Sequence, residues 1–122
     1  MSKGREAAVD RIRHMVSAAE AIRGYVARGR ATYDSDSAIR DAIVYQIVVL
    51  GEAAKAVVAA DVTVERDVPE IKWSLWAKMR DRVTHQYWAV DSEIVWNTAE
   101  HDVPMIGRLL SDALKKLGAG NP

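Results

Sequence analysis

The sequence predicts an all-α fold, an antiparallel bundle of four to five helices, and three observations support this. Proline is rare, occurring only three times in 122 residues. The long segments between helix-breaking residues repeat apolar side chains at steps of three and four, the spacing that keeps one helix face apolar. Hydrophobic residues make up 49% of the chain and charged residues 28%, which is typical of a soluble globular protein. The length suits a single domain with one modest core.

The first two helices follow from apolar periodicity. The first carries Val9, Ile12, Val16, Ala19, Ile22 and Val26. Gly29 and the polar stretch after it end this helix, and the next can be capped by Asp34, Ser35 or Asp36. The second helix carries Ile39, Ile43, Ile47, Leu50, Ala54 and Val57. Its many β-branched residues would also suit a strand, but no turn signal interrupts residues 39–60. We therefore predict a helix there, and the most buried one.

Residues 61–70 (DVTVERDVPE) form a linker with no sustained period. A third helix is expected from about Lys72 to Tyr87, followed by a short break at residues 89–91. Asp91 is a good N-cap for the fourth helix, and Val90 and Val95 occupy the positions of a hydrophobic staple.

The fourth helix is expected to continue to Leu117, and Pro104 should kink or divide it. We assign residues 1–117 to one helical domain and residues 118–122 to a flexible tail.

Composition narrows the possible environments of the protein. There is no cysteine, which excludes disulfides and thiolate metal sites and fits a reducing compartment. No apolar run approaches the roughly 20 residues that span a bilayer, and the N-terminal segment is too charged for a signal peptide. We expect a cytoplasmic protein with no membrane partner.

Charge balance argues against broad electrostatic binding of long nucleic acid duplexes. Seventeen basic and seventeen acidic side chains give a net charge of zero, whereas such proteins usually show a basic excess. A local cationic stretch does exist, formed by Lys72, Lys78, Arg80 and Arg82 and opposed there only by Asp81.

The sequence RDRVTHQY at residues 80–87 is the main candidate site. On a helix, Arg80, Thr84 and Tyr87 share one face. Asp81 and His85 form an i,i+4 pair, so the Asp81 carboxylate could accept the Nδ1 proton of His85 and leave Nε2 free for proton transfer. Arg80 and His85 differ by about 140° around the axis, so they do not stack directly.

These residue types suit RNA cleavage by the 2′-hydroxyl of the substrate itself. That reaction needs a proton acceptor, a proton donor and a cation at the phosphate, and it requires no metal or other cofactor. One histidine cannot be acid and base at once, which suggests a symmetric dimer. The competing interpretation is a solvated charged face or an ion-pair cluster.

Four blocks of sequence, in order, resemble the HepT-like proteins, the toxin branch of the HEPN superfamily. Arg80, His85 and Tyr87 reproduce the R-x4-H-x-Y signature of that family. The flanking blocks are LGEAAKAV (50–57), PEIKW (69–73), MRDRVTHQYWAVD (79–91) and VWNTAEHDVP (95–104). Trp88-Ala89 stands where the family more usually has Phe-Gly. The likeness extends over nearly the whole chain.

The resemblance implies a homodimeric HEPN fold with a metal-independent endoribonuclease site at the dimer cleft. It also implies a type VII toxin–antitoxin pair with an MntA-like minimal nucleotidyltransferase as antitoxin. Carried over, Arg80 and His85 take the catalytic positions, Asp81 supports them, and Tyr87 matches the tyrosine that the antitoxin modifies with AMP. The alternatives are a non-catalytic helical adaptor of a nucleotidyltransferase, and a structural dimer whose motif builds interface ion pairs.

Several other residues have simpler interpretations. Tyr87 could be a core tyrosine, and His14 and His101 are most simply surface or helix-end residues. No E-x-x-H pair occurs, so we predict no metal site. Glu52 and Lys55 could border the cleft or form an ion pair on the helix surface. The tryptophans, at positions 73, 76, 88 and 96, suit core and dimer-interface anchors, and Trp88 is the one to consider for RNA stacking.

Overall fold

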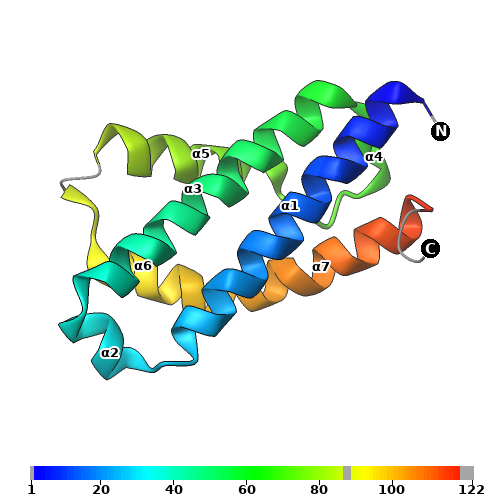
Figure 1. Cartoon of the computed structure of the whole chain (residues 1–122). Coiled ribbons are helices and arrows are strands. Elements are labelled where there is room, and N and C mark those ends of the chain that lie inside the picture. Colours follow the sequence, from blue (N-terminus) through cyan, green and yellow to red (C-terminus); the bar gives the residue numbers. More distant parts are fainter. Residues whose placement is uncertain (1, 87–88, 119–122) are drawn as a thin grey trace.

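A computed structural model describes residues 2–86 and 89–118 of the chain, and this part is helical with no strand (Figure 1). The helices are α1 (Lys3–Val26), α2 (Arg30–Ser35), α3 (Ser37–Ala60), α4 (Thr63–Asp67), α5 (Trp73–His85), α6 (Ser92–Asn97), the π-helix η2 (Thr98–Asp102) and α7 (Val103–Lys116). The predicted all-α bundle is confirmed.

The two longest helices, α1 and α3, begin at side-chain caps. The hydroxyl of Ser2 accepts a hydrogen bond from the Arg5 amide. The carboxylate of Asp36 accepts one from the Ala38 amide, which selects Asp36 from the three predicted candidates. The predicted second helix is confirmed, with its start at Ser37.

The polar stretch after Gly29 contains α2, a short helix that we did not predict. Arg30 and Asp34 form an i,i+4 ion pair at 2.8 Å on its surface. Tyr33 is buried, and its hydroxyl donates to the backbone oxygen of Ser92 at 2.8 Å. One buried apolar residue in a polar segment gives no detectable periodicity. The helix α2 therefore depends on the tertiary contact of that residue.

The linker at residues 61–70 also contains a helical turn that its sequence pattern did not predict. In α4, the Asp61 carboxylate accepts a hydrogen bond from the Thr63 amide at 3.0 Å. Val64 is fully buried and holds the turn against the core. One local hydrogen bond from the preceding Asp61 and one buried anchor hold this turn, and neither produces a sustained period.

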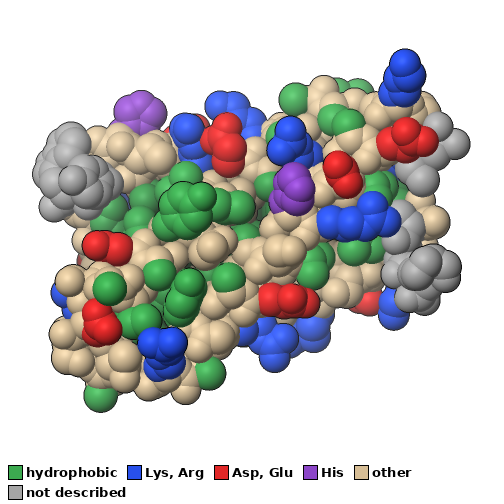
Figure 2. Space-filling model, in the orientation of Figure 1, with side chains coloured by type: hydrophobic (Ala, Val, Ile, Leu, Met, Phe, Trp, Pro, Cys, Tyr) green, Lys and Arg blue, Asp and Glu red, His purple; other side chains and the backbone are tan. Residues whose placement is uncertain are grey.

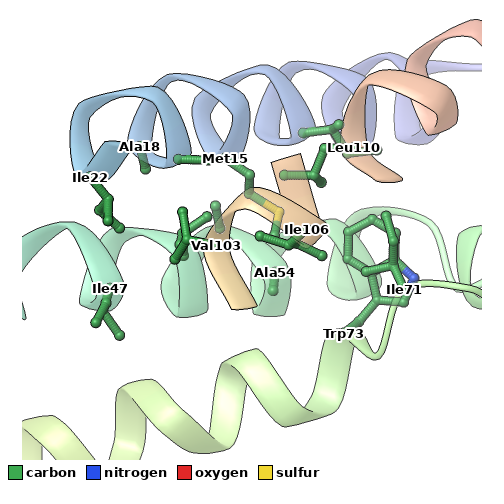
Figure 3. Close-up of a cluster of buried hydrophobic side chains, with 14 of the residues drawn as sticks. Met15, Ala18, Ile22, Ile47, Ala54, Ile71, Trp73, Val103, Ile106 and Leu110 are labelled. Atoms are coloured by element: carbon green, nitrogen blue, oxygen red, sulfur yellow. The ribbon is translucent and has the colours of Figure 1, made fainter. Parts of the chain in front are cut away.

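The core lies where α1 packs against α3 and α7. Figure 3 shows Met15 of α1 among Ile106, Val103 and Ala54, with Trp73 and Ile71 closing one end. By length and composition alone α3 could cross a membrane. The same test is passed by core helices of soluble proteins, and α3 packs against both α1 and α5.

The last helical segment is divided, as predicted from Pro104. α6 is followed by the π-helix η2, and Pro104 lies in the first turn of α7. Proline has no N–H to donate and its ring crowds the carbonyl four residues earlier, so the preceding turn widens. The predicted cap is also present, because Asp91 accepts from the amides of Glu93 and Ile94.

Candidate active site

The motif helix α5 is held close to α3 by a glycine. A Cβ atom on Gly51 would lie 2.3 Å from the Cβ of Arg80 and 2.5 Å from the backbone oxygen of Trp76. Neither distance is possible for a real side chain, so only glycine at position 51 lets the two helices meet at this separation. The close approach places Arg80 directly against α3.

Arg80 contacts two carboxylates. Its Nε lies 2.7 Å from Oε2 of Glu52, although the N–H is not aligned for a hydrogen bond. Its Nη1 donates to Oδ1 of Asp81 at 3.1 Å. The Arg80 side chain is 28% exposed, so it contacts both carboxylates and is still accessible to solvent.

His85 is exposed in the last turn of α5. Its Nδ1 lies 2.8 Å from the backbone oxygen of Asp81. A carbonyl oxygen can only accept, so in this hydrogen bond Nδ1 carries the proton and Nε2 is the basic nitrogen of the neutral ring. The sequence predicted this tautomer and this residue pair, but with the wrong acceptor atom, because the Asp81 carboxylate turns to Arg80 instead.

The structure describes the motif helix up to His85, with Gln86 as its C-cap. Tyr87 and Trp88 lie outside the described residues, so the expectations for Tyr87 as the modified residue and for the Trp88-Ala89 substitution stay predictions. Arg80 and His85 do not touch in the described part of the chain, which agrees with their expected separation around the helix axis.

A groove of about 490 Å³ opens on another face of α5, because this helix packs extensively only against α3. Its apolar lining comes from α5 and α7 and consists of Leu75, Trp76, Met79, Met105, Ile106 and Leu109. Its charged rim consists of Glu70, Lys72, Lys78, Arg82 and Asp102. Leu75 and Met105 are each more than half exposed, which is unusual for large apolar side chains gathered in one groove.

Figure 2 shows acidic and basic side chains interspersed over the face that it presents, with hydrophobic side chains between them over α3. Of the predicted cationic stretch of Lys72, Lys78, Arg80 and Arg82, all but Arg80 line the groove, and Glu70 and Asp102 line it with them.

Sequence reasoning missed the role of Gly51 and left Glu52 open between two interpretations. Glu52 pairs with Arg80, so it borders the motif. A glycine inside a strongly helical segment was the available signal for Gly51, since such a residue often marks a close approach of two backbones. Only the fold could identify its neighbour.

No group of three or more histidine, aspartate or glutamate side chains within residues 2–86 and 89–118 is arranged to hold a metal ion. His101 lies 3.6 Å from its neighbour Glu100 and is exposed, as is His14.

An all-α bundle with an arginine held between carboxylates and a histidine of defined tautomer on one exposed helix has the features of a HEPN-type ribonuclease. Sequence comparison supports this assignment directly. A sequence model of the family described as "Ribonuclease HepT-like" matches residues 15–113. The chain belongs to the HepT-like ribonuclease family, which confirms the resemblance found from the motif blocks.

Curated relatives carry related names. A putative RNase of Methanocaldococcus jannaschii is 32% identical over 83 residues, covering 68% of this chain and 69% of the relative. The probable ribonuclease HepT of Thermococcus cleftensis is 32% identical over 71 residues, covering 58% of this chain and 62% of the relative. A putative RNase of Caldanaerobacter subterraneus is 28% identical over 81 residues, covering 66% of this chain and 70% of the relative. No solved structure matches significantly.

Proposed function

We propose that this protein is a metal-independent endoribonuclease toxin that acts in the cytoplasm and uses Arg80 and His85 as its catalytic residues. The observation that carries the proposal is the geometry of His85, which is exposed and whose Nδ1 is hydrogen-bonded to the Asp81 carbonyl, while Nε2 has no hydrogen-bond partner among residues 2–86 and 89–118. The names of the relatives, a probable ribonuclease HepT among them, support RNA as the substrate.

In the proposed reaction, Nε2 of His85 takes the proton from a ribose 2′-hydroxyl. The 2′-oxygen attacks the adjacent phosphorus, and the bond from phosphorus to the 5′-oxygen breaks. A second imidazole, in its protonated form, donates a proton to that leaving oxygen, so the products are a 2′,3′-cyclic phosphate and a 5′-hydroxyl. Arg80 stabilises the charge that develops on the phosphate oxygens.

The second imidazole is supplied, in our proposal, by a second copy of the chain that occupies the groove between α5 and α7. Lys78 on the groove rim and His85 are seven residues apart, so they point in nearly the same direction from α5. A twofold axis through the groove would bury its apolar lining and bring two copies of His85 toward each other.

We further propose that an MntA-like nucleotidyltransferase antitoxin silences the enzyme by transferring AMP to Tyr87. Tyr87 is two residues beyond His85, so an added phosphate would compete with RNA phosphate for Arg80 and block the approach to the histidine. Co-expression with a small nucleotidyltransferase should add AMP to this tyrosine, detected by mass spectrometry. An unmodified Tyr87 in a neutralised toxin would argue against this step.

The nuclease is tested by comparing RNA cleavage by the wild type with that by His85→Ala and Arg80→Ala. Each variant should lose activity by about 100-fold or more while keeping its helical circular dichroism spectrum. Equal cleavage by all three proteins would assign the activity to a contaminant. Absence of cleavage by pure wild type, together with a stable nucleotidyltransferase complex, would favour the non-catalytic adaptor instead.

The dimer is tested by the molar mass of Leu75→Lys and Met105→Lys in solution. Both substitutions put a charge into the apolar groove and should yield monomers. Val62→Lys is a matched control, because Val62 is also a largely exposed apolar residue and does not line the groove. A wild-type monomer, or dimers in every variant, would contradict the groove as the interface.

A further inference from the structure

Glu52 reaches the motif from another helix. It lies on α3, next to Gly51, and its Oε2 is 2.7 Å from Nε of Arg80. The Glu52 side chain is 58% exposed, so burial of the carboxylate itself is not what this contact provides to the fold. An exposed ion pair usually contributes little to stability, which raises the question of what else the contact does.

The guanidinium of Arg80 has three nitrogen atoms, and the two carboxylates contact different ones. Glu52 sits against Nε, and Asp81 accepts from Nη1. Among the residues that the structure describes, none accepts a hydrogen bond from Nη2. Nη2 is thus left for a ligand, while Nη1 is held by a hydrogen bond and Nε lies in an ion-pair contact with the Glu52 carboxylate. Contacts on two sides restrict rotation of the guanidinium.

We propose that Glu52 is a positioning residue for Arg80, which limits the guanidinium to a single hydrogen bond with Asp81 so that Nη2 faces the RNA phosphate. This inference rests on the proposed nuclease function. Without Glu52, Asp81 is the one carboxylate left beside Arg80 in the described part of the chain. The guanidinium would then turn to form a bidentate pair with Asp81, and its free edge would leave the phosphate position.

The contact of Glu52 with Arg80 should speed RNA cleavage but weaken RNA binding. These opposite effects distinguish a positioning role from a structural one. Glu52 places a negative charge beside the phosphate site and therefore weakens the attraction of RNA. Removing that charge should tighten RNA binding while it slows cleavage. A residue that merely stabilised the fold would change neither the affinity nor the rate of the folded molecules.

The experiment compares Glu52→Ala and Glu52→Gln with the wild type at saturating RNA. We expect kcat to fall about tenfold in Glu52→Ala, because small displacements of a catalytic group carry large rate costs. In Glu52→Gln, kcat should fall less, since the amide oxygen of glutamine can still contact Nε of Arg80. RNA affinity, measured without cleavage in a His85→Ala background, should become roughly two- to five-fold tighter in Glu52→Ala.

Asp41→Ala is the matched control, since it removes one exposed carboxylate from the same helix at a position with no ion pair in the described residues. It should leave kcat and RNA affinity unchanged. If Arg80→Ala is inactive and Glu52→Ala cleaves as well as the wild type, the role of Glu52 is wrong and the nuclease stands. If Arg80→Ala also cleaves normally, both proposals fail.

Discussion

Arg5 and Arg80 are both held between two carboxylates, yet their surroundings differ. Arg5 donates from Nε to Asp61 and from Nη2 to Asp67, each at 2.7 Å, and Nη2 also donates to the Thr63 hydroxyl at 2.8 Å. These bonds tie the start of α1 to the segment around α4. The side chains of Arg5, Asp61 and Asp67 are 21%, 13% and 32% exposed, so the cluster is partly buried.

Arg80 is held more loosely. One of its contacts, with Glu52, lacks hydrogen-bond alignment, the other is 3.1 Å long, and both carboxylates are about half exposed. The comparison teaches that the number of ion pairs does not reveal the role of an arginine. Arg5 makes short hydrogen bonds from both Nε and Nη2 to other parts of the fold, whereas Nη2 of Arg80 donates to none of the described residues.

Exchanging each arginine for alanine tests this comparison and should give the largest effects. Arg80→Ala should abolish RNA cleavage, by about 100-fold or more, and leave the Tm nearly unchanged. Arg5→Ala should retain cleavage per folded molecule and lower the Tm by several degrees, because Asp61 loses its hydrogen bond to Arg5 and Asp67 is left with its exposed neighbour Arg66. Thermal unfolding and cleavage assays on the same samples provide the measurement. A large loss of stability in Arg80→Ala would remove the distinction.

Gly51→Ala should give the next largest effect. The added Cβ collides with the backbone of Trp76 and with Arg80, so we expect a cost of about 1–3 kcal/mol in the free energy of unfolding, together with reduced cleavage. Gly24→Ala is the control. Gly24 is exposed in α1 and its Cβ would meet nothing within 4 Å, so this change should stabilise by about 0.5–1 kcal/mol. Chemical denaturation measures both, and equal effects would contradict the close approach.

Lowering the pH should have a smaller effect, a loss of the stability that the Arg5 cluster provides. Hydrogen bonding to Arg5 lowers the pKa of Asp61 from 3.8 to about 2, and it lowers the pKa of Asp67 in the same direction. A carboxylate whose pKa is lowered in the folded state stabilises the protein at pH values above the ordinary pKa of that carboxylate. That contribution is lost as pH falls from about 4 toward 2.

The Tm of the wild type should therefore drop across this range more steeply than that of Asp61→Asn. The Tm of Asp41→Asn should fall as that of the wild type does, because Asp41 is exposed and has no ion pair with any described residue. Parallel curves for all three proteins would show that the cluster does not contribute to acid stability.

The sequence by itself determined the all-α class, the long helices, the cap at Asp91, the division at Pro104 and the position of the motif on a helix. These features depend on local rules, namely apolar spacing, side-chain capping and the missing N–H of proline, which act within a few residues. The family also followed from the sequence, because the motif blocks keep their order and spacing.

Only the tertiary structure decided the two short helices, the contact of Glu52 with Arg80 and the choice of acceptor for His85. Helix α2 depends on the buried Tyr33, whose hydroxyl donates to Ser92 far along the chain, and α4 depends on Val64, which is buried in the core. The Arg80 contact depends on Gly51, which admits α5 to a distance that no other residue allows. The Asp81 carboxylate accepts a hydrogen bond from Arg80, since a carboxylate pairs most strongly with a nearby cation. His85 therefore donates from Nδ1 to the backbone oxygen of Asp81 instead.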